Sequence, residues 1–154
     1  MLARVRMTLA AQILTLVAVL ACGLFAGAAV YITLVEHPAR LSCSTEVAAK
    51  QWAPSYKRAT VMQASLAVVA AVAGGARGIQ THHWLWLVGA VAILAVVPFT
   101  LLVIYPTNHK LLDPARDLAS EETRHLLESW GQLHAVRSAL GLVALVLYVG
   151  AAIR

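Results

Sequence analysis

Charged side chains are scarce in this sequence. Only 12% of its 154 residues are Asp, Glu, Lys or Arg, whereas 60% are hydrophobic. Ordinary soluble domains are about one quarter charged. A soluble fold of this length buries only about two-thirds of the surface that its unfolded chain exposes, so it has no place for so much apolar surface. The composition therefore excludes soluble globular, disordered and fibrous proteins, and it indicates an integral membrane protein.

Cysteine is also scarce, and no basic stripe accompanies the positive net charge. The 2 cysteines, Cys22 and Cys43, are too few for a disulfide framework and too far apart along one helix to pair. The 12 Lys and Arg residues outnumber the 7 Asp and Glu residues, but they are scattered among apolar runs. That scatter argues against nucleic acid as a partner. The lipid bilayer is the expected partner instead.

Four segments are long and apolar enough to cross a bilayer, which takes roughly 17–25 residues in a helix. They lie at about residues 8–35, 59–76, 84–105 and 133–153. Arg4, Arg6 and the apolar run after them resemble a signal peptide, but the run continues to Val35, which favours a retained span. Because lipid leaves backbone groups no external partner, the spans are helices. The sequence predicts one all-α domain over residues 1–154, an integral membrane four-helix bundle with up-down topology.

Proline and glycine predict where these helices end. We expect Pro38 to end the first span, because proline restricts the residue before it. We expect Gly74 and Gly75 to end the second span and Pro106 to end the third. Pro98 inside the third span predicts a kink.

Two long loops, residues 36–58 and 106–132, are expected on the same side of the membrane. Ser120 followed by Glu121 predicts the start of a short amphipathic helix that leads into the fourth span. All 7 acidic residues fall on this side. Cations near the spans favour a cytoplasmic position for the loops, in a multi-pass protein of the cell (inner) membrane.

Reactive side chains gather at four span ends on this side. An ionisable group at membrane depth is costly and normally faces inward, so we expect a shared pocket beneath the loops. Glu36 and Arg40 lie one turn apart, as an ion pair requires. In the fourth span, Trp130, His134 and Arg137 lie on one stripe of the helix. The candidate catalytic residues are His37, Asn108, His134 and Arg137, and the candidate substrate-binding residues are Glu36, Arg40, Tyr56, Lys57, Gln63 and Trp130.

The same residues leave the cofactor open. Imidazole suits copper and iron, and the candidate metal ligands are Glu36, His37, His109 and His134. A metal-free pocket fits equally well, with histidine as acid or base and with Arg137 or Asn108 binding a developing oxyanion. No HExxH or CxxC motif, nucleophile elbow, phosphate loop or nucleotide fingerprint occurs in the sequence.

The motifs, taken in order, resemble those of a known family. They are Gly23-Leu24-Phe25-Ala26-Gly27, Glu36-His37-Pro38-Ala39-Arg40, Trp52-x-x-Ser55-Tyr56-Lys57-Arg58, Pro98-Phe99-Thr100, Pro106-Thr107-Asn108-x-x-Leu111 and Trp130-x-x-Leu133-His134-x-x-Arg137. In this order and spacing they resemble the anthrone-oxygenase-like family of small four-helix membrane proteins. The matching functional positions are Glu36, His37, Arg40, Tyr56, Lys57, Asn108, His134 and Arg137.

The resemblance implies a monooxygenase that acts on activated aromatic carbon, with O₂ as co-substrate. Fungal members are associated with the oxidation of anthrones to anthraquinones, so a lipophilic phenolic, anthrone- or quinone-like molecule is the expected substrate. The benzylic C–H of an anthrone is acidic, and His134 or His37 is the expected base. The alternative is a non-enzymatic membrane module that binds a lipid, quinone or other small molecule, or that assembles with a partner subunit. No inverted repeat supports a transporter.

Overall fold

The computed structural model describes residues 8–154, and within that range the chain is helical, without strands. Its elements are α1 (Leu9–Tyr31), the π-helix η1 (Ile32–Glu36), α2 (His37–Leu41), α3 (Thr45–Thr81), α4 (Trp84–Phe99), the π-helix η2 (Thr100–Ile104), α5 (Tyr105–Leu111) and α6 (Glu121–Ala152). They join into 4 continuous rods, each apolar and long enough to cross a membrane. Arg4 and Arg6 lie outside the described residues. The predicted four-helix membrane bundle is confirmed.

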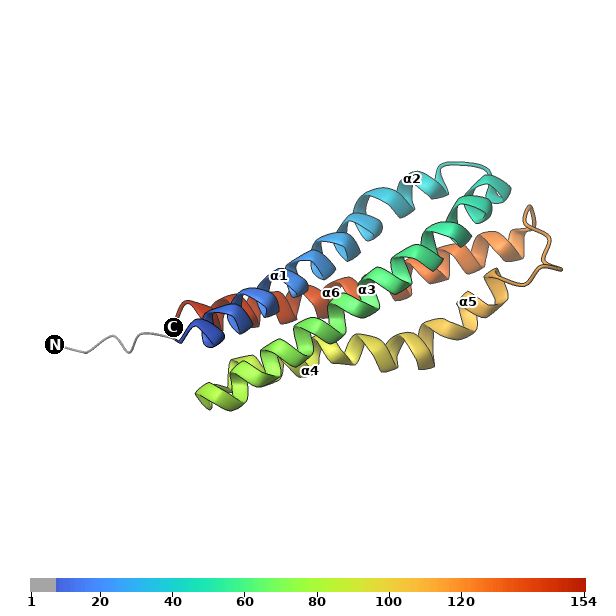
Figure 1. The fold of residues 1–154 in the computed structure, drawn as a ribbon. Coiled ribbons are helices and arrows are strands. Elements are labelled where there is room, and N and C mark those ends of the chain that lie inside the picture. The colour runs from blue at the N-terminus through green and yellow to red at the C-terminus, as the bar shows by residue number, and fades with distance from the viewer. Residues whose placement is uncertain (1–7) are drawn as a thin grey trace.

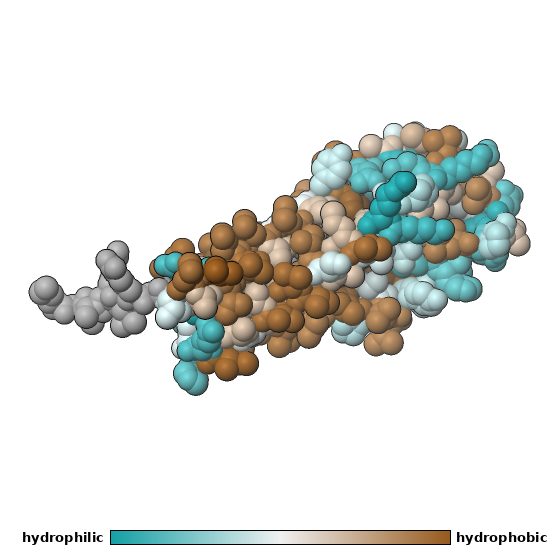
Figure 2. Space-filling model, viewed as in Figure 1, coloured by the Kyte–Doolittle hydropathy of each residue, from teal (hydrophilic) through white to brown (hydrophobic). Residues whose placement is uncertain are grey.

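The rods run alternately in opposite directions and enclose one core (Figure 1). The α1 rod packs against α3 and α6, and α4 packs against the same two helices on the other side. Figure 2 shows an apolar surface over most of the bundle, a large group of hydrophilic side chains at one end and a smaller group at the other. That end carries the α2–α3 and α5–α6 connections, and we call it the polar end. The protein is therefore a multi-pass membrane protein with most of its polar side chains at one end.

The two connections at the polar end are much shorter than the expected loops. Helix α3 already begins at Thr45, so the expected loop 36–58 shrinks to residues 42–44. The expected loop 106–132 shrinks to residues 112–120, since α6 begins directly after Ser120. The Ser120 hydroxyl accepts the Thr123 backbone N–H at 3.2 Å, which confirms the predicted N-cap. The long-loop prediction is wrong because polar residues extend each helix beyond its apolar stretch. The expected amphipathic stretch is the first part of α6, and it leads directly into the fourth span.

Pro38 and Pro106 do not end their helices, contrary to the prediction. Each follows a π-helical segment, in which the residue before the proline, His37 or Tyr105, donates its N–H to the carbonyl five residues earlier. An ordinary α-turn would press the proline ring against the carbonyl four residues back. The wider π-turn accommodates the ring, so the helix continues. The rod that contains Pro98 is visibly bent (Figure 1), as expected for a kink.

The glycines of α3 also lie inside the helix rather than at its end. Helix α3 runs past Gly74 and Gly75 to Thr81, and the turn into α4 contains only His82 and His83. The prediction that they end the helix is wrong. A glycine is needed at position 74 because the Tyr148 side chain occupies the space that a Cβ would need.

The buried core has two parts along the bundle axis. The part away from the polar end is rich in alanine and holds Phe25, Trp86 and Tyr148; we call it the apolar core. The part at the polar end holds Trp52 and Trp130 with aliphatic neighbours; we call it the polar-end core. Most candidate site residues lie in or beside the polar-end core, so the fold gathers them around two tryptophans.

Candidate functional site

A narrow cavity of about 10 Å³ lies inside the bundle at the polar end, enough for about one water molecule. Its lining includes Arg40, Trp52, Tyr56, Gln63, His134 and Arg137. These side chains come from α2, α3 and α6. We call this space the inner cavity. The π-helix η1 reaches it through Ile32, and π-helical turns occur frequently at functional sites.

The stripe of Trp130, His134 and Arg137 on α6 faces the inner cavity. The three residues are buried, with exposed fractions of 5%, 2% and 7%. The rings of Trp130 and His134 stack with their centroids 4.8 Å apart, and the His37 ring tilts against Trp130 at 5.0 Å. The spacing in the sequence therefore identified side chains that do meet in space.

His134 is held through only one of its ring nitrogens. Its Nδ1 lies 3.1 Å from Thr33 Oγ1, which lies 2.7 Å from Ser138 Oγ. The Ser138 hydroxyl donates to the His134 carbonyl oxygen. Because each hydroxyl carries one hydrogen, the arrangement in which Ser138 donates to this carbonyl has Thr33 donating to Ser138 and His134 Nδ1 donating to Thr33. In that arrangement His134 Nε2 carries the lone pair, and it has no hydrogen-bond partner within residues 8–154.

Arg137 is a buried cation without an acidic partner in the described part of the chain. Its Nη2 donates to Gln63 Oε1 at 2.8 Å, and its guanidinium lies 5.9 Å from the centre of the Phe25 ring. Arg137 Nε, Gln63 Nε2 and Trp52 Nε1 are buried without an acceptor in residues 8–154. We call these three groups the donor cluster. Buried polar groups without partners are costly, so this cluster favours an anionic oxygen as a ligand.

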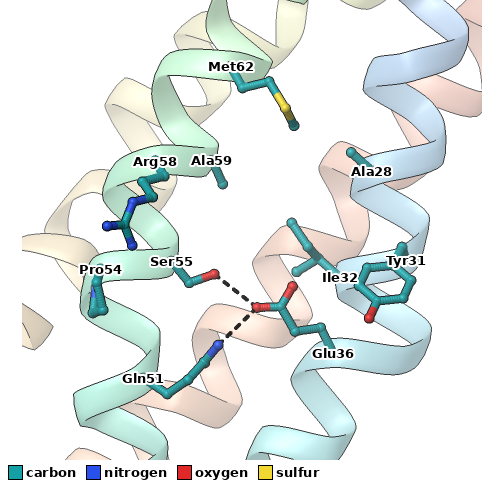
Figure 3. Close-up of a pocket in the computed structure, with 10 residues that line it drawn as sticks. All are labelled: Ala28, Tyr31, Ile32, Glu36, Gln51, Pro54, Ser55, Arg58, Ala59 and Met62. Atoms are coloured by element: carbon teal, nitrogen blue, oxygen red, sulfur yellow. Dashed lines mark hydrogen bonds between the residues drawn. The ribbon is translucent and has the colours of Figure 1, made fainter.

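Glu36 and Arg40 form the ion pair that their spacing predicts, with Arg40 Nη2 2.5 Å from Glu36 Oε1. The same carboxylate oxygen accepts from Ser55 Oγ at 2.9 Å and from Gln51 Nε2 at 3.3 Å (Figure 3). Arg40 Nε in turn donates to Gln51 Oε1. This network ties the first rod to α3 and holds Arg40 at the edge of the inner cavity.

His37 is engaged through both of its ring nitrogens, unlike His134. Its Nε2 donates to the Leu127 carbonyl oxygen at 3.0 Å, and its Nδ1 accepts from Arg40 Nη1 at 3.1 Å. A Cβ at Gly131 would lie 2.6 Å from the His37 ring, so the ring also rests directly on α6. Both ring nitrogens of His37 are thus engaged, by the Leu127 carbonyl and by Arg40, and its ring also contacts Trp130.

Tyr56 and Asn108 close the inner cavity on its α5 side. The buried Asn108 donates from Nδ2 to the Tyr56 hydroxyl at 3.1 Å, and the Tyr56 ring stacks on Trp52 at 4.9 Å. Tyr56 lines the inner cavity and Asn108 does not. Asn108 therefore orients Tyr56, one side chain away from the cavity itself.

Two of the predicted site residues lie outside this arrangement. Lys57 and His109 are both exposed, and the closest ring to His109 is that of Tyr105, at 6.2 Å. The expected metal ligands are therefore not brought together: within residues 8–154, no three His, Cys, Asp or Glu side chains lie as a metal site requires. The engaged nitrogens of His37 agree with this geometry. The residues present do not fit the expected metal centre.

The family model described as anthrone oxygenase matches residues 52–147. The chain belongs to the anthrone oxygenase family. This confirms the resemblance seen in the motifs and supports an oxygenase-like function at the level of the family. No solved structure matches the chain.

Three fungal anthrone oxygenases resemble the chain to different extents. The protein from Claviceps purpurea is 29% identical over 146 residues, which cover 85% of this chain and 84% of the relative. Anthrone oxygenase nsrD from Aspergillus novofumigatus is 33% identical over 114 residues, 68% of this chain and 70% of the relative. Anthrone oxygenase tpcL from Aspergillus fumigatus is 44% identical over 64 residues, and this match spans 40% of either chain.

The motifs of this anthrone oxygenase family member did not identify Thr33, Gln51 or Ser138, and they included Ser55 without a role. Thr33 and Ser138 complete the hydrogen-bond chain of His134, and Gln51 and Ser55 hold Glu36. Ser138 lies one helical turn after His134, so its spacing was a usable signal. The four-residue spacing of Gln51 and Ser55 was equally regular, but it lay in a segment expected to be a loop.

Proposed function

We propose that this member of the anthrone oxygenase family is a membrane-embedded oxygenase for a lipophilic phenolic molecule of the anthrone type, with O₂ as co-substrate. One observation carries the proposal: the donor cluster and the free Nε2 of His134 lie at one small buried cavity. A proton acceptor opposite a cationic donor set is what enolate formation requires.

The first step is the removal of a benzylic proton from the anthrone. His134 Nε2 accepts this proton, because Nδ1 is already committed to Thr33. The electron pair of the broken C–H bond moves into the ring system, and the carbonyl oxygen becomes an oxyanion. Arg137, Gln63 and Trp52 then donate to that oxyanion from the positions that lack acceptors. Donors that are preorganised in a water-poor site stabilise such a charge strongly.

The second step joins the enolate carbon to O₂. A C–O bond forms, and the proton held by His134 returns to the terminal oxygen, which gives a hydroperoxide. Loss of the second benzylic proton then breaks the O–O bond, releases water and leaves a new carbonyl group. The sum is anthrone plus O₂ giving anthraquinone plus water, and the oxidised carbon supplies all the electrons that reduce O₂.

The remaining polar residues hold this arrangement in place. His37 and Arg40 contact Trp130, with the Arg40 guanidinium 6.0 Å from the centre of the indole ring. Trp130 covers one face of His134, which restricts the imidazole to one orientation. Asn108 and Tyr56 support Trp52 from the other side. Rotamers locked by such neighbours keep a base and its oxyanion donors within reach of one substrate.

The direct test is incubation of the purified protein in lipid nanodiscs with an anthrone, in air and under argon. We expect quinone to form in air faster than in protein-free nanodiscs, and no quinone to form under argon. The protein-free sample measures spontaneous oxidation, and circular dichroism reports whether the helices are intact. A helical protein whose aerobic rate equals the protein-free rate would overturn the proposal.

A further inference from the structure

The inner cavity is too small for the proposed substrate, but a larger groove lies beside it. The inner cavity measures about 10 Å³ and the groove about 600 Å³. Sites for small organic molecules ordinarily measure about 300–1,000 Å³. The groove lies between the first rod and α3 (Figure 3). Its size therefore suits a planar polycyclic molecule, whereas the inner cavity is too small for one.

The groove and the inner cavity are separated by a thin wall. Ile32, Ser55 and Ala59 line both spaces. Ile32 is buried and is the first residue of the π-helix η1, while Ala59 contributes only a methyl group. His134 and Arg137 line the inner cavity but not the groove. A molecule in the groove is thus one layer of side chains away from the proposed base.

The groove is apolar at one end and polar at the other. Ala28 and Met62 lie at the apolar end, and Glu36 and Gln51 lie at the polar end (Figure 3). The Ser55 hydroxyl points to the Glu36 carboxylate between the two ends. A hydroxylated aromatic molecule has the same division, with ring carbons at one edge and hydroxyl groups at another.

The groove opens on the lateral surface of the bundle. Tyr31 and Met62 at its rim are 56% and 49% exposed, and both belong to helices apolar enough to cross a membrane. Their exposed neighbours Leu34 and Val61 are apolar as well. A molecule dissolved in lipid reaches this rim without passing through water.

We infer that this groove binds the organic substrate, a planar hydroxylated polycyclic molecule that arrives laterally from the bilayer, and that Ile32 is the gate between the groove and His134. The inference rests on the proposed function. Rotation of the Ile32 side chain joins the two spaces, so that the central ring brings its carbonyl oxygen to the donor cluster and its benzylic carbon to His134 Nε2 while an outer ring stays in the groove. Met62 and Ile32 are then the residues that determine which substrates are accepted.

Two pairs of variants test the groove, each with a control on the same element. Met62→Trp narrows the mouth, and Val61→Trp places the same side chain on an adjacent position that does not line the groove. Ile32→Trp thickens the wall, and Leu34→Trp is its exposed control on η1. The readouts are the KM for the anthrone and the binding of a dihydroxyanthraquinone, followed by the fluorescence of the quinone itself. We expect Met62→Trp and Ile32→Trp to weaken quinone binding and raise KM about tenfold or more, and both controls to match the wild type.

The outcomes separate the groove from the proposed function. If the wild type binds the quinone but does not oxidise the anthrone, the proposed function fails, and the groove stands when Met62→Trp weakens binding. If the wild type oxidises the anthrone while Met62→Trp and Ile32→Trp leave KM and quinone binding unchanged, the groove is overturned and the function stands. A wild type that neither binds nor oxidises overturns both. Because Met62 is half exposed, its variant tests the groove even where Ile32→Trp does not fold.

Discussion

The two parts of the core differ in the purpose of their close contacts. In the apolar core, glycines allow rings to lie directly on a neighbouring helix, as Gly89 does for Tyr148 and Gly141 does for Phe25. The Tyr148 hydroxyl donates to the Ala70 carbonyl oxygen at 2.8 Å, so this ring is packed and hydrogen-bonded. Contacts of this kind lower the free energy of the folded state and leave no room for a ligand.

The polar-end core is built in the opposite way. Its tryptophan and histidine rings enclose a cavity, and Trp52, Gln63, Asn108 and Arg137 each hold a buried polar atom without a partner in residues 8–154. Such atoms destabilise the folded state unless a ligand satisfies them. Close packing therefore stabilises the apolar core, whereas the polar-end core holds unpartnered polar atoms that the proposed substrate would satisfy.

The largest effect is expected from His134→Ala. Without the base, kcat for anthrone oxidation should fall about 100-fold or more, which is the usual contribution of a general base. The matched control is His125→Ala, an exposed histidine on the same helix, which should keep the wild-type rate. Initial rates of oxygen-dependent quinone formation are the measurement. Equal activity of His134→Ala and wild type would show that His134 is not the base. The proposed functional difference between the two cores would then have no support from this residue.

Arg137→Gln should lower kcat/KM by about 100-fold, since one oxyanion donor commonly contributes that much. The same change removes a buried cation that has no acidic partner in residues 8–154, so the melting temperature should stay level or rise. Arg124→Gln is the control, because Arg124 is paired with Glu128 at 3.0 Å. Activity and thermal unfolding are measured on the same preparations. A decrease in both kcat/KM and the melting temperature would show that Arg137 stabilises the fold, as the residues of the apolar core do.

The sequence predicted the architecture and part of the site, and its errors share a physical cause. Apolar length located the rods, and helical spacing brought Trp130, His134 and Arg137 to one cavity. The prediction stopped helices at Pro38 and Pro106, because a local rule cannot see that a π-turn makes room for the ring. The start of helix α3 was placed too late for another reason, because the first part of the helix is polar, and this concealed the helical spacing at the polar end.

The sequence also did not predict which way individual side chains point. Lys57 and His109 have the right chemistry and the right depth, yet both are exposed. One residue along a helix rotates a side chain by about 100°, so Tyr56 faces the inner cavity while Lys57 faces away. Only the packing of all four rods decides such a rotation. Whether the nitrogens of His37 and His134 are free depends in the same way on partners from distant parts of the chain.

Gly89→Ala tests the structural side of the comparison. The new Cβ would lie 2.6 Å from the Tyr148 ring, so a helix or ring must shift, at a cost of about 1–3 kcal/mol for overpacking. Gly150→Ala is the control, because nothing lies within 4 Å of the Cβ built there. We expect a lower melting temperature for Gly89→Ala alone, with kcat per folded molecule unchanged. A loss of kcat without a change in melting temperature would mean that the two cores are not separate in function.

The smallest effect is expected from Tyr148→Phe, which keeps the ring and removes only the hydroxyl group. The variant loses the hydrogen bond to the Ala70 carbonyl oxygen, and a neutral buried hydrogen bond contributes about 1 kcal/mol. Tyr31→Phe serves as the control, because the Tyr31 ring is exposed at the groove rim. Thermal unfolding in nanodiscs should show a decrease of a few degrees for Tyr148→Phe only. A decrease in melting temperature as large as that of Gly89→Ala would mean that this hydroxyl stabilises the apolar core as much as close packing does. Glycine contacts alone would then not explain the stability of the apolar core.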